Sequence, residues 1–310
     1  MRRIPVLVLL ASLPLAVLCL LAISSRWWYA GEIGANCSLH AALLLLPALI
    51  VWRKSPLVSG SLILCLAIGI SPWLRAAWEP RAPVADPQAM LIPVASANLF
   101  IYNQQRAAAV QAALAQNAKI LVLEESISSE DRPLVSTERY PYQIWETQND
   151  RKWRDCVALL SVYPIEWQQA FDRDRQTYIA ATLNVNGRPL HVIAVHTFSP
   201  HIPQRWVGRN EQLARIVQTI TVLQERRPAP VLLLGDWNLT VGSAAWRDFH
   251  QTGGVRRASQ REPISWPSFF GPFGITIDHI LGINLALGPQ HSFIIPGSDH
   301  HGLNGTIQLP

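Results

Sequence analysis

Three long uncharged stretches at the start of the chain limit what this protein can fold into. Residues 4–25 and 55–74 carry no charged side chain. Residues 33–52 also lack one, except for His40, which is neutral at pH 7. Each stretch is about 20 residues long, the length that an α-helix needs to cross the hydrocarbon core of a bilayer. The prolines inside them fit this interpretation, because membrane helices tolerate proline. The sequence therefore predicts three transmembrane helices, 4–25, 33–52 and 55–74.

The alternative for the first stretch is a cleaved signal peptide, but two further apolar stretches behind it favour permanent anchoring.

The residues that flank these stretches predict their orientation. Arg2, Arg3, Arg53 and Lys54 lie at the same side of the predicted helices, which should be the cytoplasmic side. Three crossings then place the rest of the chain outside the cytoplasm. We expect an inner- or plasma-membrane protein whose main domain is periplasmic if the cell is Gram-negative.

The positive charge of the chain belongs to this N-terminal third. Residues 1–81 hold seven basic and two acidic residues, which leaves 19 of each in residues 82–310 and accounts for the net charge of +5. The high pI is therefore no sign of nucleic-acid binding. A proline-rich stretch follows and is predicted to be a stiff linker. We predict a membrane anchor over 1–78, a linker over 79–90 and one folded domain over 91–310.

Short apolar runs and two helical patterns alternate irregularly in this domain. The helical patterns cover 104–116 and 204–226, where apolar residues recur at three- and four-residue spacing. Strands are predicted over 91–102, 120–123, 156–161, 178–185, 190–195, 230–238, 275–281, 292–295 and 305–309. In an extended chain over 230–238, Asp236 and Asn238 would face the same way, and Trp237 would face the opposite side and pack into the core. Asn186-Gly187 predicts a hairpin turn, because both residues readily adopt positive φ. The irregular order favours an α/β (α+β) fold with mixed sheets over a purely parallel sheet.

Polar side chains recur at the ends of six of these strands. They are Asn98, Glu125, His196, Asp236 with Asn238, Asp278 with His279, and Asp299 with His300. Each alone has a common structural explanation, such as the start of a loop or a hydrogen-bonded core histidine. Their recurrence indicates one shared site. Carboxylates gathered at one end of a sheet repel each other unless a cation or a proton lies among them. Oxygen ligands of this kind suit Mg²⁺ or Mn²⁺ rather than zinc.

The strand ends lie within six short motifs that follow one another along the chain. The motifs are Ser96-Ala97-Asn98, Leu123-Glu124-Glu125, Ala194-Val195-His196, Gly235-Asp236-Trp237-Asn238, Ile277-Asp278-His279 and Ser298-Asp299-His300. In this order the set resembles the endonuclease/exonuclease/phosphatase superfamily, also called deoxyribonuclease-I-like, over about residues 91–310. The resemblance implies a four-layer α/β/β/α sandwich with two mixed sheets. It also implies divalent-metal-dependent hydrolysis of phosphodiesters or phosphomonoesters.

The same resemblance implies a metal site. Glu125 resembles the principal ligand of Mg²⁺ or Mn²⁺, with Asn98 and Asp299 close to the ion. Glu124 stands where glutamine is common in the family, so the choice between the two neighbouring glutamates stays open, with Glu125 preferred.

Roles in catalysis follow by position for the remaining motifs. Asp236 resembles the residue that orients or deprotonates the attacking water, and Asn238 and His196 would hydrogen-bond the phosphate oxygens. Asp278 would pair with His300 and keep it cationic beside the phosphate, because a carboxylate partner raises the pKa of a histidine. Amide and imidazolium donors supply the charge neutralisation that phosphoryl chemistry needs.

Three further departures from the family pattern leave the substrate class open. Lys119 replaces an acidic residue before the strand of Glu125, and Val162 and Thr276 stand where arginine is frequent. The last two changes remove cations that would contact substrate. A nuclease-like phosphodiesterase is favoured, and a lipid-headgroup or small-molecule phosphodiesterase or phosphatase is the alternative.

Charge clusters and anchoring support different substrates. The clusters Arg151, Lys152, Arg154 and Arg256, Arg257, Arg261 favour nucleic acid. The predicted membrane anchor brings phospholipids within reach. A protein of another class, an inactive binding or scaffold protein, would lack site residues, and none is lost. A calcineurin-like phosphatase needs an aspartate where Leu239 stands. We expect a monomer.

Overall fold

The computed structural model describes the backbone of residues 3–146, 156–173, 176–258 and 261–310. The chain divides into two compact units. Unit 1 comprises residues 1–79, 199–210 and 239–251, and unit 2 comprises residues 80–198, 211–238 and 252–310. Each unit therefore combines segments that lie far apart in the sequence.

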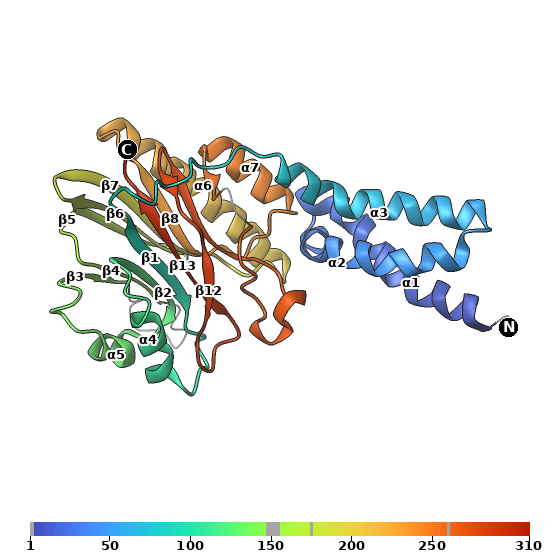
Figure 1. Ribbon diagram of the computed structural model, residues 1–310, viewed down its shortest axis with the longest axis horizontal. Coiled ribbons are helices and arrows are strands. Elements are labelled where there is room, and N and C mark those ends of the chain that lie inside the picture. Colours follow the sequence, from blue (N-terminus) through green and yellow to red (C-terminus); the bar gives the residue numbers. More distant parts are fainter. Residues whose placement is uncertain (1–2, 147–155, 174–175, 259–260) are drawn as a thin grey trace. The chain divides into compact units, whose positions relative to one another are not determined.

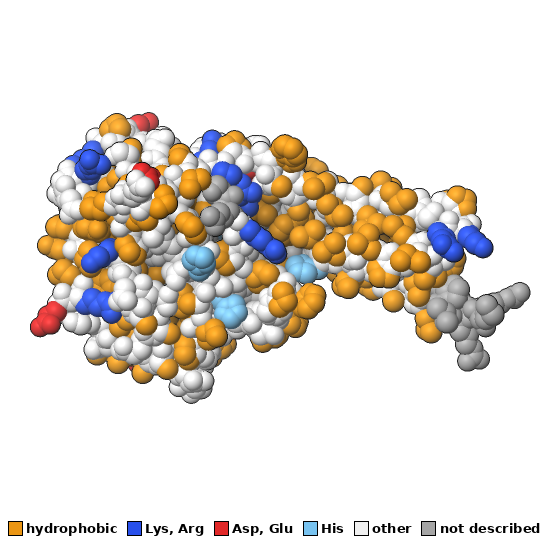
Figure 2. Space-filling view, in the orientation of Figure 1, with side chains coloured by type: hydrophobic (Ala, Val, Ile, Leu, Met, Phe, Trp, Pro, Cys, Tyr) orange, Lys and Arg blue, Asp and Glu red, His pale blue; other side chains and the backbone are white. Residues whose placement is uncertain are grey.

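Unit 1 contains the three predicted apolar helices. They are α1 (Arg3–Leu21), α2 (Tyr29–Trp52) and α3 (Pro56–Ala77), with a 3₁₀ turn, η1 (Ala22–Arg26), after the first. All three are long and apolar enough to cross a membrane. Figure 2 shows that hydrophobic side chains cover most of their visible surface. The prediction of three such helices is confirmed, although α2 begins before the predicted stretch.

A buried ion pair explains how α2 accommodates a carboxylate. Glu32 lies in its first turn, and Arg209 lies in α6 (Pro203–Arg226), whose first residues belong to unit 1. The Arg209 Nη2 atom is 2.9 Å from Glu32 Oε1, and neither side chain is exposed to solvent. Leaving one member of such a pair unpaired typically destabilises a protein by about 3–5 kcal/mol. The pair therefore joins the start of α6 to α2.

Hydrogen bonds attach the segment 239–251 to the N-terminal part of unit 1. The Thr240 hydroxyl is 2.7 Å from Asn36 Oδ1, and Trp246 Nε1 donates to Glu79 at 3.0 Å. Trp246 belongs to α7 (Ala244–Gly253), a helix that the sequence analysis did not predict. Unit 1 is thus built from the N-terminal helices and from the residues that follow two strands of unit 2.

Unit 2 contains two mixed sheets (Figure 1). The first is formed in order by β11 (Ala286–Leu287), β13 (His301–Gln308), β1 (Ile92–Asn98), β2 (Ile120–Ser126), β4 (Cys156–Ser161) and β3 (Tyr142–Trp145), with β12 (His291–Ile294) beside β13. The second is formed by β5 (Ile165–Arg173), β6 (Gln176–Val185), β7 (Arg188–His196), β8 (Val231–Asp236), β10 (Asp278–Ile283) and β9 (Arg256–Arg257). The pairs β1/β2 and β7/β8 are parallel and the other pairs are antiparallel.

Apolar side chains from both sheets form the central core of unit 2. Val94 and Val122 of the first sheet cluster with Val192 and Leu232 of the second. Helix α4 (Arg106–Leu114) packs on the other face of the first sheet, in a second cluster with β1, β2 and β4. Helix α6 lies against the second sheet, where Tyr178 of β6 hydrogen-bonds Thr219 at 2.9 Å. The predicted α/β sandwich of two mixed sheets with flanking helices is confirmed.

Differences from the predicted elements lie mainly at the sheet edges. The strands β3, β5, β9 and β11, which were not predicted, include the edge strands of both sheets. An edge strand has one neighbour and needs fewer apolar residues, so its pattern is weak. The hairpin at Asn186-Gly187 is confirmed, with φ of 53° and 87°.

Residues of the predicted linker lie along unit 2. The amide of Ala82 donates to Arg257 in β9 at 2.8 Å, and the amide of Leu287 in β11 donates to Pro83 at 2.9 Å. Ala82 and Ala85 are buried. This stretch therefore connects an edge of each sheet.

Gly235, in the strand that ends at Asp236, provides a test of the packing between β7 and β8. Its φ is +139°, and an added Cβ would lie 1.9 Å from the carbonyl oxygen of Val195 in the paired strand. We expect Gly235→Ala to lower the free energy of unfolding by at least about 2 kcal/mol. Calorimetry of the detergent-solubilised full chain measures the change as a drop of several degrees in the melting temperature.

The matched control is Gly187→Ala in the hairpin turn. Gly187 also has positive φ, +87°, but apart from its chain neighbours no heavy atom lies within 4 Å of an added Cβ. The substitution there only forces alanine into a left-handed backbone conformation, which costs about 1 kcal/mol. Equal melting temperatures for the two variants would contradict the predicted clash in the strand pair.

Candidate active site

The end of β8 is the centre of the candidate site. Asp236, its last residue, is 1% exposed. Its Oδ2 atom accepts a hydrogen bond from Asn98 Nδ2 at 3.0 Å, and its Oδ1 atom accepts one from the backbone amide of Asn238 at 2.8 Å. The Nε2 atoms of His196 and His300 lie 3.6 Å and 3.8 Å from Oδ2. Four of the predicted site residues therefore surround one carboxylate.

Asp236 and Asn238 lie close together because the chain turns after Asp236, not because it stays extended as predicted. An extended chain was expected to turn both side chains to the same face. The strand instead ends at Asp236, and Asn238 adopts a left-handed backbone with φ of 46°. This turn places Asn238 Nδ2 at 2.9 Å from the carbonyl of Thr197 and 3.2 Å from Asp236 Oδ2. Trp237 between them is fully buried, as predicted.

Glu125 lies beside this centre at the end of β2. Its Oε1 atom accepts from Asn98 Nδ2 at 3.2 Å and lies 3.7 Å from His196 Nε2, and its Oε2 atom accepts from the amide of Ile101 at 2.7 Å. The side-chain amide nitrogen of Asn98 thus donates to two carboxylates, Glu125 and Asp236. Its oxygen accepts from the amide of Phe100 at 3.0 Å.

Glu124 has different surroundings from its neighbour. It is fully buried, and Ser96 donates to its Oε1 atom at 2.6 Å. Burial, with Asp278 and Asp236 nearby, raises the pKa of Glu124 well above its usual value, which favours the neutral acid. The Glu125 side chain is 18% exposed. These surroundings favour Glu125 over Glu124 as the ligand of a cation.

Asp278 and His300 form an ion pair next to Asp236. Asp278 is the register partner of Asp236 across β10 and β8, and its Oδ2 atom is 2.9 Å from His300 Nδ1. Burial alone would lower the pKa of His300, but Asp278 and then Asp236 raise it to about 10. Burial and the charge of Asp278 raise the pKa of Asp236 to about 6. The predicted pairing of Asp278 with His300 is present, and it favours the cationic form of the histidine.

Asp299 is held at the edge of this group. Its Oδ2 atom accepts from Trp266 Nε1 at 3.0 Å. The neighbouring Ser298 hydroxyl donates to the carbonyl of Asn98 at 2.8 Å and accepts from the amide of His300 at 3.1 Å. The loop before β13 is therefore attached to the end of β1, next to the other site residues.

The donor set fits a hard divalent cation. Single donor atoms of Asp236, Asp278 and His300 lie within 4.8 Å of one another. Asp278 and His300 also pair with each other, with Oδ2 of the aspartate 2.9 Å from Nδ1 of the histidine. The carboxylate of Glu125 is 18% exposed and shares the Asn98 amide with Asp236, and in the described part of the chain it forms no ion pair with an arginine or lysine. Oxygen ligands of this type suit Mg²⁺ or Mn²⁺.

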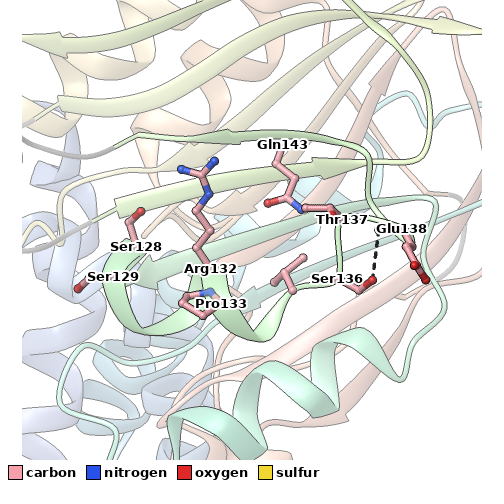
Figure 3. A pocket seen from close by; sticks show the side chains of 9 residues that line it. Ser128, Ser129, Arg132, Pro133, Ser136, Thr137, Glu138 and Gln143 are labelled. Atoms are coloured by element: carbon pink, nitrogen blue, oxygen red, sulfur yellow. Dashed lines mark hydrogen bonds between the residues drawn. The ribbon is translucent and has the colours of Figure 1, made fainter.

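A separate hollow on unit 2 contains none of the predicted site residues. It lies beside the short helices α5 (Ser128–Asp131) and η2 (Arg132–Leu134), and Gln143 of β3 lines it with them (Figure 3). Its lining lacks the paired carboxylates and histidines of the strand ends. This hollow therefore does not offer the donor set that is present at the strand ends.

The family comparison agrees with this geometry. Residues 95–300 match the model of the endonuclease/exonuclease/phosphatase family, a range that includes all six motifs. The chain belongs to this family. Members of the family are metal-dependent phosphoester hydrolases, so the protein is a hydrolase of phosphate esters. No curated protein matches the sequence.

Solved structures share the fold at low sequence identity. Sphingomyelinase C from Streptomyces griseocarneus is 19% identical with a TM-score of 0.54, and the match covers 70% of this chain and 99% of that one. A beta toxin variant from Staphylococcus aureus with bound magnesium ions is 17% identical, with a TM-score of 0.54 and the same coverage. TDP2 from D. rerio, complexed with a single strand DNA product, is 16% identical with a TM-score of 0.56, covering 71% and 100%. At these identities the likeness shows the fold alone.

A buried charged cluster that includes His279, the residue after Asp278, could not be predicted from the sequence. Glu262 accepts from Arg257 Nη1 at 2.8 Å and lies 2.9 Å from His279 Nδ1. All three side chains are buried. The sequence placed Arg257 in a basic loop and His279 at a strand end, and no local pattern pointed to their shared partner.

This cluster predicts loss of stability in acid. Burial would raise the pKa of Glu262, but His279 and Arg257 lower it to about 2. Its contribution to folding is therefore present above the unfolded pKa, near 4.5, and is lost as the pH falls towards 2. We expect Glu262→Gln to destabilise the protein at pH 7 and to reduce the loss of stability between pH 4.5 and 2 by roughly 3 kcal/mol.

Thermal melts of the solubilised full chain across this pH range measure the effect. Exposed Glu138→Gln is the control and should follow the wild type. If the wild type and Glu262→Gln lose stability in parallel below pH 4.5, Glu262 is not the linked group.

Proposed function

We propose that the protein hydrolyses phosphodiester bonds with a bound Mg²⁺ or Mn²⁺ ion, and that helices α1 to α3 anchor it in a membrane. The convergence of strand-end residues on Asp236 carries this proposal. Glu125 is the proposed principal ligand, with Asn98 and Asp299 beside the ion. When bound, the ion would neutralise charge on the phosphate and polarise its oxygens.

The protein's own residues supply the other requirements of phosphate ester hydrolysis. Asp236 orients the attacking water and accepts its proton, and Asn98 and Asn238 hold its carboxylate in place through hydrogen bonds. His196 would donate to the phosphate oxygens. The side-chain amide of Asn238 would do so by exchanging one of its present bonds, to the Thr197 carbonyl or to Asp236, for the phosphate. His300, kept cationic by Asp278, stabilises the negative charge that develops there.

A lipid phosphodiester is a second candidate substrate, supported by an apolar tip beside the site. The 3₁₀ segment η3 (Ser268–Phe273) carries Phe269, Phe270 and Phe273, each more than half exposed. Its first residue, Ser268, donates its amide to the carbonyl of Asp299 at 2.7 Å. Exposed aromatic side chains are suited to the interface of a bilayer. The tip would hold the site at a lipid surface.

The charge clusters give less support to nucleic acid than the sequence suggested. Arg257 is buried and paired with Glu262, so it does not belong to an exposed basic surface. The Arg256 Nη1 atom donates to the carbonyl of Val255 at 3.1 Å. Arg151, Lys152 and Arg154 lie outside the described residues. A surface that binds DNA through its phosphates needs several exposed cations.

The catalytic assignment is tested with the full chain in lipid nanodiscs. Residues 199–210 and 239–251 form a compact unit with residues 1–79, so truncation would remove their partners. We expect Glu125→Gln and His300→Ala each to lower the Mg²⁺-dependent hydrolysis rate at least about 100-fold. The assay compares plasmid DNA, RNA and phospholipid vesicles in parallel, and the preferred substrate separates the two candidates.

The matched controls are Glu138→Gln and His291→Ala, which change the same residue types at exposed positions. Both should keep the wild-type rate. Undiminished hydrolysis in Glu125→Gln or His300→Ala would show that the proposed site is wrong.

The proposed topology predicts where the C-terminus lies. Alkaline phosphatase fused after Pro310 should be active and a fluorescent protein at the same position dark, because the main domain is proposed to be outside the cytoplasm. Fusions after Lys54 should give the opposite pattern. A C-terminal reporter active only in the cytoplasm would overturn the orientation.

A further inference from the structure

A largely buried arginine links two backbone segments at the proposed metal site. Arg106 begins α4, and its side chain is 10% exposed. Its Nη1 atom donates to the carbonyl of Phe100 at 3.1 Å, and its Nη2 atom donates to the carbonyl of Glu125 at 3.0 Å. Its Nε atom donates to Asp131 at 3.0 Å. One guanidinium therefore contacts the backbone after β1 and the backbone of the proposed principal ligand.

Both carbonyls belong to residues in a strained conformation. Phe100 has a φ of 60° and Glu125 a φ of 49°, in the left-handed region that side chains other than glycine disfavour. Such a residue costs about 1–2 kcal/mol and persists only where its surroundings hold it. Arg106 is a common hydrogen-bond donor to both residues.

The direction of the Glu125 carboxylate depends on these two backbones. The pairing of β2 with β4 is irregular between Leu123 and Ser126, so the ladder does not fix the backbone of Glu125. Its Oε2 atom accepts from the amide of Ile101, the residue after Phe100. A shift of either loop would therefore move the carboxylate away from Asn98.

Asp131 holds the arginine in place from α5. Its side chain is fully buried, and it accepts from two nitrogens of Arg106. The amide of Ile127 donates to the same carboxylate at 2.6 Å. Two parallel bonds between a guanidinium and a carboxylate fix the plane of both groups.

We propose that Arg106 and Asp131 are positioning residues for the metal ligand Glu125. Neither touches the ion; they hold the Glu125 backbone in the conformation that presents its carboxylate. The inference rests on the proposed metal site. Residues that orient a metal ligand in this way typically contribute about 10–100-fold to metal affinity.

Mn²⁺ binding to the full chain in detergent provides a readout besides activity. Paramagnetic resonance measures free Mn²⁺ and gives Kd directly. We expect Arg106→Lys to raise Kd about 10-fold or more, because an ammonium group cannot bind Asp131 and two carbonyls with the same geometry. The Mg²⁺ concentration for half-maximal hydrolysis should rise by the same factor, with most of kcat restored at saturation.

Arg139→Lys is the matched control. Arg139 also donates to backbone at α4, to the carbonyl of Leu114 at the end of the helix, and it contacts Asn117 rather than the metal site. The Arg139→Lys substitution should lower the melting temperature without changing the Kd for Mn²⁺. Asp131→Asn is the second test variant, because it keeps the shape of the aspartate if Arg106→Lys does not fold.

The outcomes separate the inference from the proposed function. A Kd within twofold of the wild type in folded Arg106→Lys and Asp131→Asn, with a lowered melting temperature, would overturn the inference and leave a purely structural ion pair. Wild-type Mn²⁺ binding that Glu125→Gln does not weaken would instead overturn the proposed metal site. Weakened binding in all three variants, but not in Arg139→Lys, supports both.

Discussion

The burial of neighbouring carboxylates at the ends of β8 and β10 is the constraint on which the site depends. Asp236 and Asp278 are register partners, and both are almost fully buried. Such a pair is unfavourable unless positive charge or a proton lies beside it. His300 supplies that charge, and Asn98 and Asn238 satisfy the remaining oxygens of Asp236. The ion pair and hydrogen bonds that offset this repulsion also fix the positions of the groups in the proposed phosphate and cation site.

Strained backbones at the strand ends turn these side chains towards one another. Glu125 and Asn238 have left-handed conformations, and Gly235 brings β8 close to β7. The two sheets with their common apolar core provide the rigid support that holds such conformations. Two of the left-handed residues, Glu125 and Asn238, thus lie where strands of unit 2 end at the candidate site.

The central strands and their terminal polar residues were predictable, because buried strands are continuous apolar runs bounded by polar residues. The ion pairs of the interior were not. Glu32 seemed to belong to a loop, and its partner Arg209 follows much later in the chain. Arg257 seemed to belong to an exposed basic cluster, whereas Glu262 and His279 surround it. Local periodicity carries no information about the partner of a charged side chain.

The sequence by itself determined the three apolar helices, the residue types at the strand ends and the family, because hydrophobic length and short motifs are local properties. Only the tertiary structure distinguished Glu124, buried with Ser96, from Glu125, partly exposed beside Asn98. It also decided that residues 199–210 and 239–251 pack with the N-terminal helices. Burial and charge pairing are set by residues distant in the chain, so only the folded structure shows which of the two carboxylates is sealed from solvent and which is partly exposed.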